Sequence, residues 1–97
     1  MTSIIAGIDV GNSTTEAAIA EIHSFQSPPR FLGASRVQTT GIKGTLSNIP
    51  GMVMALRQAV EDAGIHINDI DLALLNEATP VIGDIAMETI TETIITE

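Results

Sequence analysis

The sequence contains no cysteine, no tryptophan and no tyrosine, and only four lysine and arginine residues in total. Without cysteine the chain has no disulfide, no thiolate zinc site and no iron–sulfur cluster. The acidic excess gives a net charge of −8, which argues against binding to nucleic acid or to anionic membrane surfaces. No apolar run approaches the roughly 18 residues of a membrane span, and no signal-peptide pattern opens the chain. We therefore expect a cytoplasmic protein.

The composition indicates a folded domain, because 44% of the 97 residues are hydrophobic and only 16% are charged. The segments 4–8, 17–22 and 72–75 carry apolar residues on both faces of the strands they would form, which predicts a sheet covered on both faces. Only one helix is predicted to cover it. Either the chain forms a homo-oligomer or it belongs to something longer, and we favour the second interpretation.

Three strands are predicted in the first part of the chain, at residues 3–10, 14–22 and 30–39. The first two form a hairpin over residues 4–22, and the paired prolines at 28–29 belong to the loop that follows it. Together they predict an antiparallel three-stranded meander.

A helix follows at about residues 48–63, because apolar residues recur there at spacings of three and four. Ser47 or Asn48 is expected to cap its start, and Gly64 to end it in the left-handed conformation. A short fourth strand is then predicted at residues 71–76, apolar enough to be a central, parallel strand of the sheet. The last stretch, 85–97, leads towards a following domain, and its β-branched residues favour an extended conformation over a helix.

The turn between the first two strands contains the residues that predict a binding site. Gly11 is expected to supply a positive φ angle, and the residues after it offer backbone N–H groups and hydroxyls within a short distance. Converging donors of this kind bind phosphate. Asp9, near the end of the first strand, is positioned to face a phosphate-bound Mg²⁺ through the waters of the metal. An ordinary hairpin with a Gly-Asn turn is the alternative interpretation.

Two other phosphate loops are absent from the sequence. There is no G-x-x-x-x-G-K-[ST] and no G-x-G-x-x-G. Residues 9–15 instead resemble the first phosphate loop of the actin/hexokinase/Hsp70 ATPase superfamily, D-x-G-x-[ST]-x-[TS] within a β-hairpin.

A narrower resemblance covers nearly the whole chain. Residues 7–16, 39–45 and 75–97 are similar to the large subunit of diol/glycerol dehydratase reactivases, and residues 87–97 are the most specific part. The resemblance implies an α/β fold, namely an incomplete actin/hexokinase/Hsp70-like (ribonuclease H-like) ATPase subdomain. Residues 1–97 would then be its N-terminal segment.

The resemblance also implies the roles of individual residues. Asn12, Ser13 and Thr14 match the phosphate-loop positions for ATP or ADP. Gly11 and Thr15 flank them as backbone contributors, and Asp9 corresponds to the acid near Mg²⁺. The second phosphate loop and the adenosine pocket are missing from the sequence, so ATP hydrolysis by these residues alone is not expected.

The implied activity is that of an ATP-dependent, chaperone-like factor that releases damaged cobalamin from an adenosylcobalamin-dependent diol or glycerol dehydratase. The implied partners are a reactivase small subunit and that dehydratase, with association to a bacterial microcompartment left open. Three alternatives remain: a small-molecule kinase of the same superfamily, an activator of radical dehydratases (which the lack of cysteine weakens), and a non-catalytic interaction module.

Overall fold

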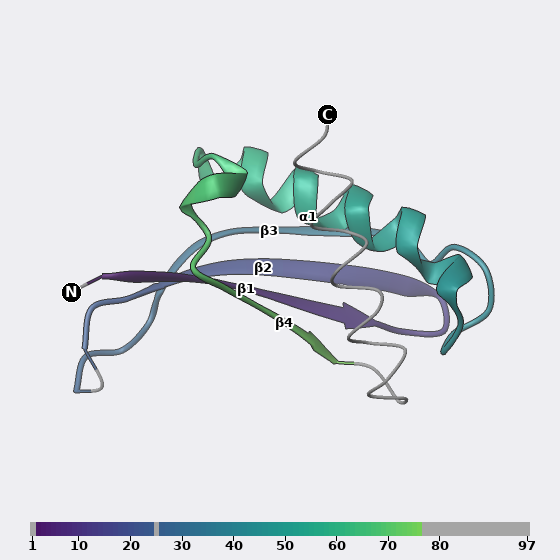
Figure 1. The fold of residues 1–97 in the computed structure, drawn as a ribbon, viewed down its shortest axis with the longest axis horizontal. Coiled ribbons are helices and arrows are strands. Elements are labelled where there is room, and N and C mark those ends of the chain that lie inside the picture. Colours follow the sequence, from purple (N-terminus) through teal and green to yellow (C-terminus); the bar gives the residue numbers. More distant parts are fainter. Residues whose placement is uncertain (1, 25, 77–97) are drawn as a thin grey trace.

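The computed structural model describes residues 2–24 and 26–76. It contains four strands, one α-helix and two short 3-10 helices: β1 (Ser3–Val10), β2 (Thr14–Ile22), β3 (Arg30–Gln38), η1 (Leu46–Asn48), α1 (Ile49–Ala63), η2 (Ile67–Asp69) and β4 (Leu72–Asn76). The strands form one sheet in the order β3-β2-β1-β4 (Figure 1). The predicted α/β class, antiparallel meander, helix and parallel fourth strand are confirmed. The predicted stretch at 85–97 lies outside the described residues.

The fourth strand differs from its prediction in one respect. β4 pairs in parallel with β1, from Ile5 beside Leu72 to Asp9 beside Asn76. In the described sheet, however, β4 is an edge strand and not a central one. Its edge position agrees with the exposure of Leu72 and Leu74, which are 49% and 55% exposed.

Helix α1 lies across one face of the sheet and forms the core with it (Figure 1). In β1 and β2 every second residue points towards the helix, as the two-residue period of a strand requires. The buried core consists of Ala6, Ile8, Val10, Ala17, Ile19, Met52, Val53, Ala55, Leu56 and Ala59. Small residues let α1 approach β3 closely: a Cβ on Gly33 would lie 2.6 Å from the backbone nitrogen of Ala63.

The ends of α1 explain where the helix begins and stops. Gly64 adopts φ 70°, and its N–H donates hydrogen bonds to the carbonyls of Val60 and Glu61. The predicted left-handed C-cap is therefore confirmed. At the other end Asn48 is the N-cap residue, but its side chain does not cap the helix. The amide instead accepts a hydrogen bond from the Gly44 N–H (3.0 Å) and donates one to the Thr40 carbonyl (2.6 Å). Buried Asn48 therefore holds the preceding loop in place.

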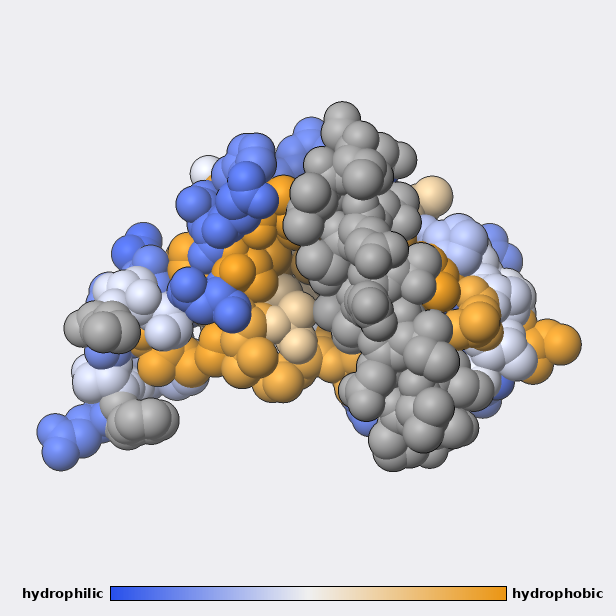
Figure 2. Space-filling view, in the orientation of Figure 1, coloured by the Kyte–Doolittle hydropathy of each residue, from blue (hydrophilic) through white to orange (hydrophobic). Residues whose placement is uncertain are grey.

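The opposite face of the sheet is covered by no helix among residues 2–24 and 26–76. Ala18, Ala34 and Asp9 are exposed there, although each lies in the interior of a paired strand. Figure 2 shows hydrophobic surface along the strands below α1 and hydrophilic residues gathered towards the ends of the molecule. The prediction of a sheet covered on both faces is therefore met on one face only within the described part of the chain. No helix in that part is both long and apolar enough to span a membrane.

Candidate functional site: the β1–β2 loop and the adjoining polar row

The β1–β2 loop reverses the chain over residues 11–13, and the Gly11 N–H donates to the Thr14 carbonyl at 2.8 Å. Among the described residues, positive φ angles occur at Gly41, Gly44 and Gly64, so the prediction of a positive φ at Gly11 is wrong. Glycine is required at position 11 for a different reason. A Cβ there would lie 2.8 Å from the Thr14 carbonyl oxygen, inside van der Waals contact.

The tip of this loop presents hydrogen-bond donors that the fold does not use. Asn12, Ser13 and Thr14 are all exposed. Within the described part of the chain, the N–H groups of Asn12 and Ser13 and the three side chains take part in no hydrogen bond. An anion is bound by backbone and hydroxyl donors that lie close together and are not used within the protein. These groups are therefore available to donate hydrogen bonds to a ligand.

Thr15 lies on the other side of the loop from these donors. Its side chain is completely buried, because position 15 belongs to the helix-facing set of β2. Its hydroxyl is 2.9 Å from that of Thr39, which in turn donates to the Gly11 carbonyl at 2.8 Å. Of the predicted hydroxyls, those of Ser13 and Thr14 are available to a ligand and that of Thr15 is occupied by the protein.

A row of polar side chains crosses the open face of the sheet next to the loop. The strand register aligns Asn76, Asp9, Glu16 and Arg36 on four neighbouring strands. Asn76 donates to Asp9 through Nδ2 and Oδ1 at 3.1 Å, and Arg36 donates to Glu16 through Nε and Oε1 at 2.7 Å. The row borders a groove of about 730 Å³ on the sheet, whose floor includes Gly7 and Ala18.

The electrostatics of the row single out Asp9. Asp9 and Glu16 lie directly opposite each other on antiparallel strands, which is unfavourable for two carboxylates. Arg36 neutralises Glu16 in an ion pair, with Nη2 2.5 Å from Oε1. Among the described residues no cation pairs with Asp9, whose partner is the neutral Asn76 amide. The row therefore carries one uncompensated negative charge, at Asp9.

This arrangement fits an indirect role at a metal better than a complete metal site. No group of three or more His, Asp or Glu residues that would hold a metal ion occurs in the described ranges. Mg²⁺ keeps several of its waters in proteins and is commonly held by one or two carboxylates together with substrate phosphates. Asp9 is a single exposed carboxylate two residues before the loop, so it could contribute to such a site but could not form one alone.

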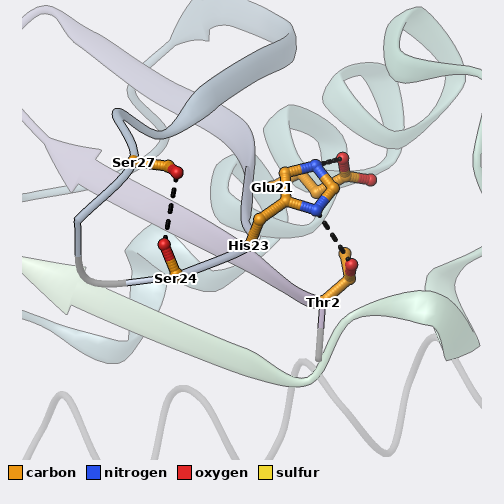
Figure 3. A network of polar contacts seen from close by, with 5 residues as sticks. All are labelled: Thr2, Glu21, His23, Ser24 and Ser27. Carbon is orange, nitrogen blue, oxygen red and sulfur yellow. Dashed lines mark hydrogen bonds and ion pairs between the residues drawn. The ribbon is translucent and has the colours of Figure 1, made fainter.

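The opposite end of the sheet carries a different set of polar contacts (Figure 3). His23 lies between Thr2 and Glu21, with Nδ1 3.1 Å from the Thr2 hydroxyl and Nε2 2.6 Å from the Glu21 carboxylate. Ser24 and Ser27 are bonded to each other at 3.2 Å within the following loop. These contacts pair the side chains of Thr2, Glu21, His23, Ser24 and Ser27 with one another.

Two residues of the site, Asn76 and Thr39, were not predicted from the sequence. Asn76 follows an apolar run at the carboxyl end of a strand parallel to β1, which is where sites of α/β proteins gather, and that position was the available signal. Thr39 lies 28 residues after Gly11 and just beyond β3. Thr39 opens the stretch 39–45 that carries part of the family resemblance, but nothing in that stretch indicates contact with the β1–β2 loop.

Comparison with known proteins places these observations in context. No family model matches the sequence. The chain is 57% identical over 93 residues to the propanediol dehydratase-reactivating factor large subunit of Citrobacter freundii. It is 55% identical over 93 residues to the diol dehydratase-reactivating factor large subunit of Klebsiella michiganensis. Each match covers 96% of this chain, which spans only 15% of the length of either relative.

Solved structures give the same result. A diol dehydratase-reactivating factor in nucleotide-free form has a TM-score of 0.68 and 45% identity, over 80% of this chain and 13% of that chain. An Aquifex aeolicus PPX-GPPA enzyme, 13% identical, has a TM-score of 0.53 over 97% of this chain and 34% of its own, a likeness in fold alone. The predicted resemblance is confirmed: this chain matches a segment of the large subunits of dehydratase-reactivating factors.

Proposed function

We propose that this chain supplies the first phosphate-binding loop of an ATP-dependent factor that reactivates a diol or glycerol dehydratase. The β1–β2 hairpin would belong to an actin/Hsp70-like ATPase subdomain. The observation that carries the proposal is the set of unused donors at Asn12, Ser13 and Thr14, in a chain 57% identical to a dehydratase-reactivating factor over 93 residues.

The chemistry of the loop follows from its donors. The N–H groups of Asn12 and Ser13 and the hydroxyls of Ser13 and Thr14 bind the phosphates of ATP or ADP, with Gly11 and Thr15 shaping the backbone between the strands. Bound Mg²⁺ would neutralise phosphate charge. Asp9 would accept hydrogen bonds from the waters of that metal, and Asn76 holds the Asp9 carboxylate through the 3.1 Å contact.

The remaining parts of the proposed activity involve other segments and other chains. The adenosine pocket and the second phosphate loop are not found in these 97 residues. A small subunit and an adenosylcobalamin-dependent dehydratase are the proposed partners. The proposed result of ATP hydrolysis is release of damaged cobalamin, after which intact coenzyme enters the dehydratase.

The test uses the whole protein with its small subunit, an inactivated dehydratase, ATP and Mg²⁺. Released cobalamin and recovered dehydratase activity are measured for the wild type and for Ser13→Ala with Thr14→Ala. We expect the double variant to lose at least about tenfold in the rate of release, because two phosphate-binding hydroxyls are removed. Ser27→Ala, in the loop at the other end of the sheet, is the matched control and should behave as wild type.

Two results would contradict the proposal. Cobalamin release that is independent of ATP would remove the role of the loop. Transfer of phosphate from ATP to a small polyol, without any effect on the dehydratase, would indicate a kinase of the same superfamily.

A further inference from the structure

Thr39 makes contact with the phosphate loop at three separate points. Its N–H donates to the Ser13 carbonyl at 2.9 Å, its hydroxyl donates to the Gly11 carbonyl at 2.8 Å, and the same hydroxyl is 2.9 Å from that of Thr15. Thr39 lies immediately after β3, a strand that is not part of the β1–β2 hairpin. One residue from a distant segment thus forms hydrogen bonds with Gly11, Ser13 and Thr15.

The direction of these bonds is fixed by counting protons. A threonine hydroxyl has one proton, and that of Thr39 is given to the Gly11 carbonyl. The Thr15 hydroxyl must therefore donate to Thr39. The resulting chain runs from Thr15 through Thr39 to the Gly11 carbonyl, and Thr15 at its buried end is 0% exposed. Linked hydrogen bonds of this kind strengthen one another.

The contact at Gly11 determines where one of the free donors points. In a trans peptide the carbonyl and the following N–H point in opposite directions. Holding the Gly11 carbonyl against Thr39 therefore aims the Asn12 N–H away from Thr39, towards the exposed side of the loop. The bond from the Thr39 N–H to the Ser13 carbonyl fixes the Ser13–Thr14 peptide in the same way, so the Asn12–Ser13 peptide is held between two fixed neighbours.

We propose that Thr39 is a positioning residue for phosphate binding, acting by orienting the peptides of residues 11–15. This inference rests on the proposed function of the loop, and it assigns to Thr39 no direct contact with nucleotide. It makes a specific demand: loss of the Thr39 hydroxyl should weaken recognition of the phosphates and leave recognition of adenosine unchanged.

The neighbouring residue provides a matched control. Thr40 is half-buried like Thr39, and its hydroxyl also makes two hydrogen bonds, donating to the Ser47 carbonyl at 2.8 Å and accepting from the Gly51 N–H at 3.0 Å. Those bonds hold the start of α1 and do not reach the phosphate loop. Thr40→Val therefore removes the same chemical group with the same number of hydrogen bonds, none of which involves residues 11–15.

The test measures competition of ADP and of adenosine against a fluorescent ADP analogue on the whole protein, for Thr39→Val, Thr39→Ser and Thr40→Val. For Thr39→Val we expect the Kd for ADP to rise about five- to tenfold, with the Kd for adenosine unchanged, because two hydrogen bonds within the loop are lost. Thr39→Ser keeps the hydroxyl and should restore the wild-type Kd. Thr40→Val should leave both values unchanged.

The outcomes separate this inference from the proposed function. If wild-type protein binds ADP and Thr39→Val binds it equally well, the inference is overturned while the proposed function stands. If Thr39→Val weakens ADP and adenosine alike, Thr39 is only structural and the inference is again overturned. If the wild type does not bind ADP, the proposed function itself fails. Should Thr39→Val not fold, Thr15→Val removes the donor at the other end of the chain, and no rise in the Kd for ADP there would overturn the inference.

Discussion

The two faces of the sheet are made by alternate residues of the same strands, yet they differ in almost every physical respect. In β1 the helix-facing residues Ala6, Ile8 and Val10 are at most 2% exposed. Their neighbours on the open face include Gly7, which has free space around it, and Asp9, which is exposed. The covered face stabilises the fold, while the open face presents the polar row and its groove.

This division explains how one small sheet can carry a row of polar side chains without losing its core. Because successive side chains of a strand point to opposite faces, Asp9 is exposed between two buried residues, Ile8 and Val10. The buried neighbours hold the backbone of position 9 in register, so the carboxylate is fixed in place at little cost. The comparison therefore predicts large effects of substitution on the covered face and small ones on the open face.

The largest effect is expected from truncating the core. Ile19 is 0% exposed beneath α1, whereas Leu74, also an aliphatic residue within a strand, is 55% exposed on the open face. Ile19→Ala should lower the free energy of unfolding by about 3 kcal/mol, since both transfer energy and packing are lost. Leu74→Ala should lower it by less than about 1 kcal/mol. Urea titration followed by circular dichroism measures both, because the chain has no tryptophan or tyrosine to serve as a fluorescent probe. Equal losses would contradict the difference between the faces.

The next effect comes from adding a single methyl group to each face. A Cβ on Gly33 would lie 2.6 Å from the Ala63 nitrogen and 3.0 Å from the Ala59 carbonyl oxygen, both of them backbone atoms of α1. A Cβ on Gly7 would have nothing within 4 Å. Gly33→Ala should therefore destabilise the fold by about 2 kcal/mol through overpacking. Gly7→Ala, the matched control, should be neutral or slightly stabilising, because alanine reduces the freedom of the unfolded chain. The same urea titration applies, and a neutral Gly33→Ala would refute the close approach of α1 to β3.

Local sequence patterns were sufficient for the elements themselves. The apolar spacing at residues 49–63 and the glycine at 64 predicted α1 and its end, since periodicity and capping are properties of consecutive residues. The patterns failed where a distant contact decides the local structure. Gly11 is required by the approach of the Thr14 carbonyl, and Asn48 uses its amide on Gly44 and Thr40 instead of capping α1.

For the candidate site, too, the sequence indicated the residues that are consecutive in the chain and missed those that only the folded sheet brings near them. Residues 11–15 and Asp9 form one continuous motif, so the sequence alone indicated a phosphate loop with an acid beside it. Thr39 and Asn76 reach that motif only because the sheet pairs β3 with β2 and β4 with β1. Asp9 and Asn76 are 67 residues apart, and the strand register that joins them is a property of the folded sheet.

A functional test of the open face uses Asp9. Asp9→Asn keeps the shape of the side chain and removes the uncompensated charge of the polar row. If Asp9 has its proposed role, we expect the increase in ADP affinity that Mg²⁺ causes to shrink about tenfold, because the carboxylate proposed to accept hydrogen bonds from the metal waters is lost. Calorimetric titration of the whole protein with ADP, with and without Mg²⁺, measures this. Glu16→Gln, which removes the neighbouring carboxylate, is the control, and an unchanged response to Mg²⁺ in Asp9→Asn would remove the metal role of Asp9.

The smallest effect is expected at the ion pair that completes the row. Arg36 and Glu16 contact each other, but their side chains are 71% and 44% exposed. Ion pairs of such exposure contribute about 0–1 kcal/mol, because water screens the attraction and two flexible side chains must be ordered. A double-mutant cycle with Arg36→Gln and Glu16→Gln should give a coupling energy below about 0.5 kcal/mol at 0.15 M salt, and lower still at 1 M salt.

A coupling energy above about 1.5 kcal/mol would mean that the open face is shielded from water in the protein as studied, since only a desolvated pair reaches that value. The double-mutant cycle therefore measures whether the open face of the sheet is exposed to water, in contrast to the face covered by α1. A weak, salt-sensitive pair leaves the stability of the sheet to the α1 face alone. The charges beside the β1–β2 loop then contribute little to the stability of the fold.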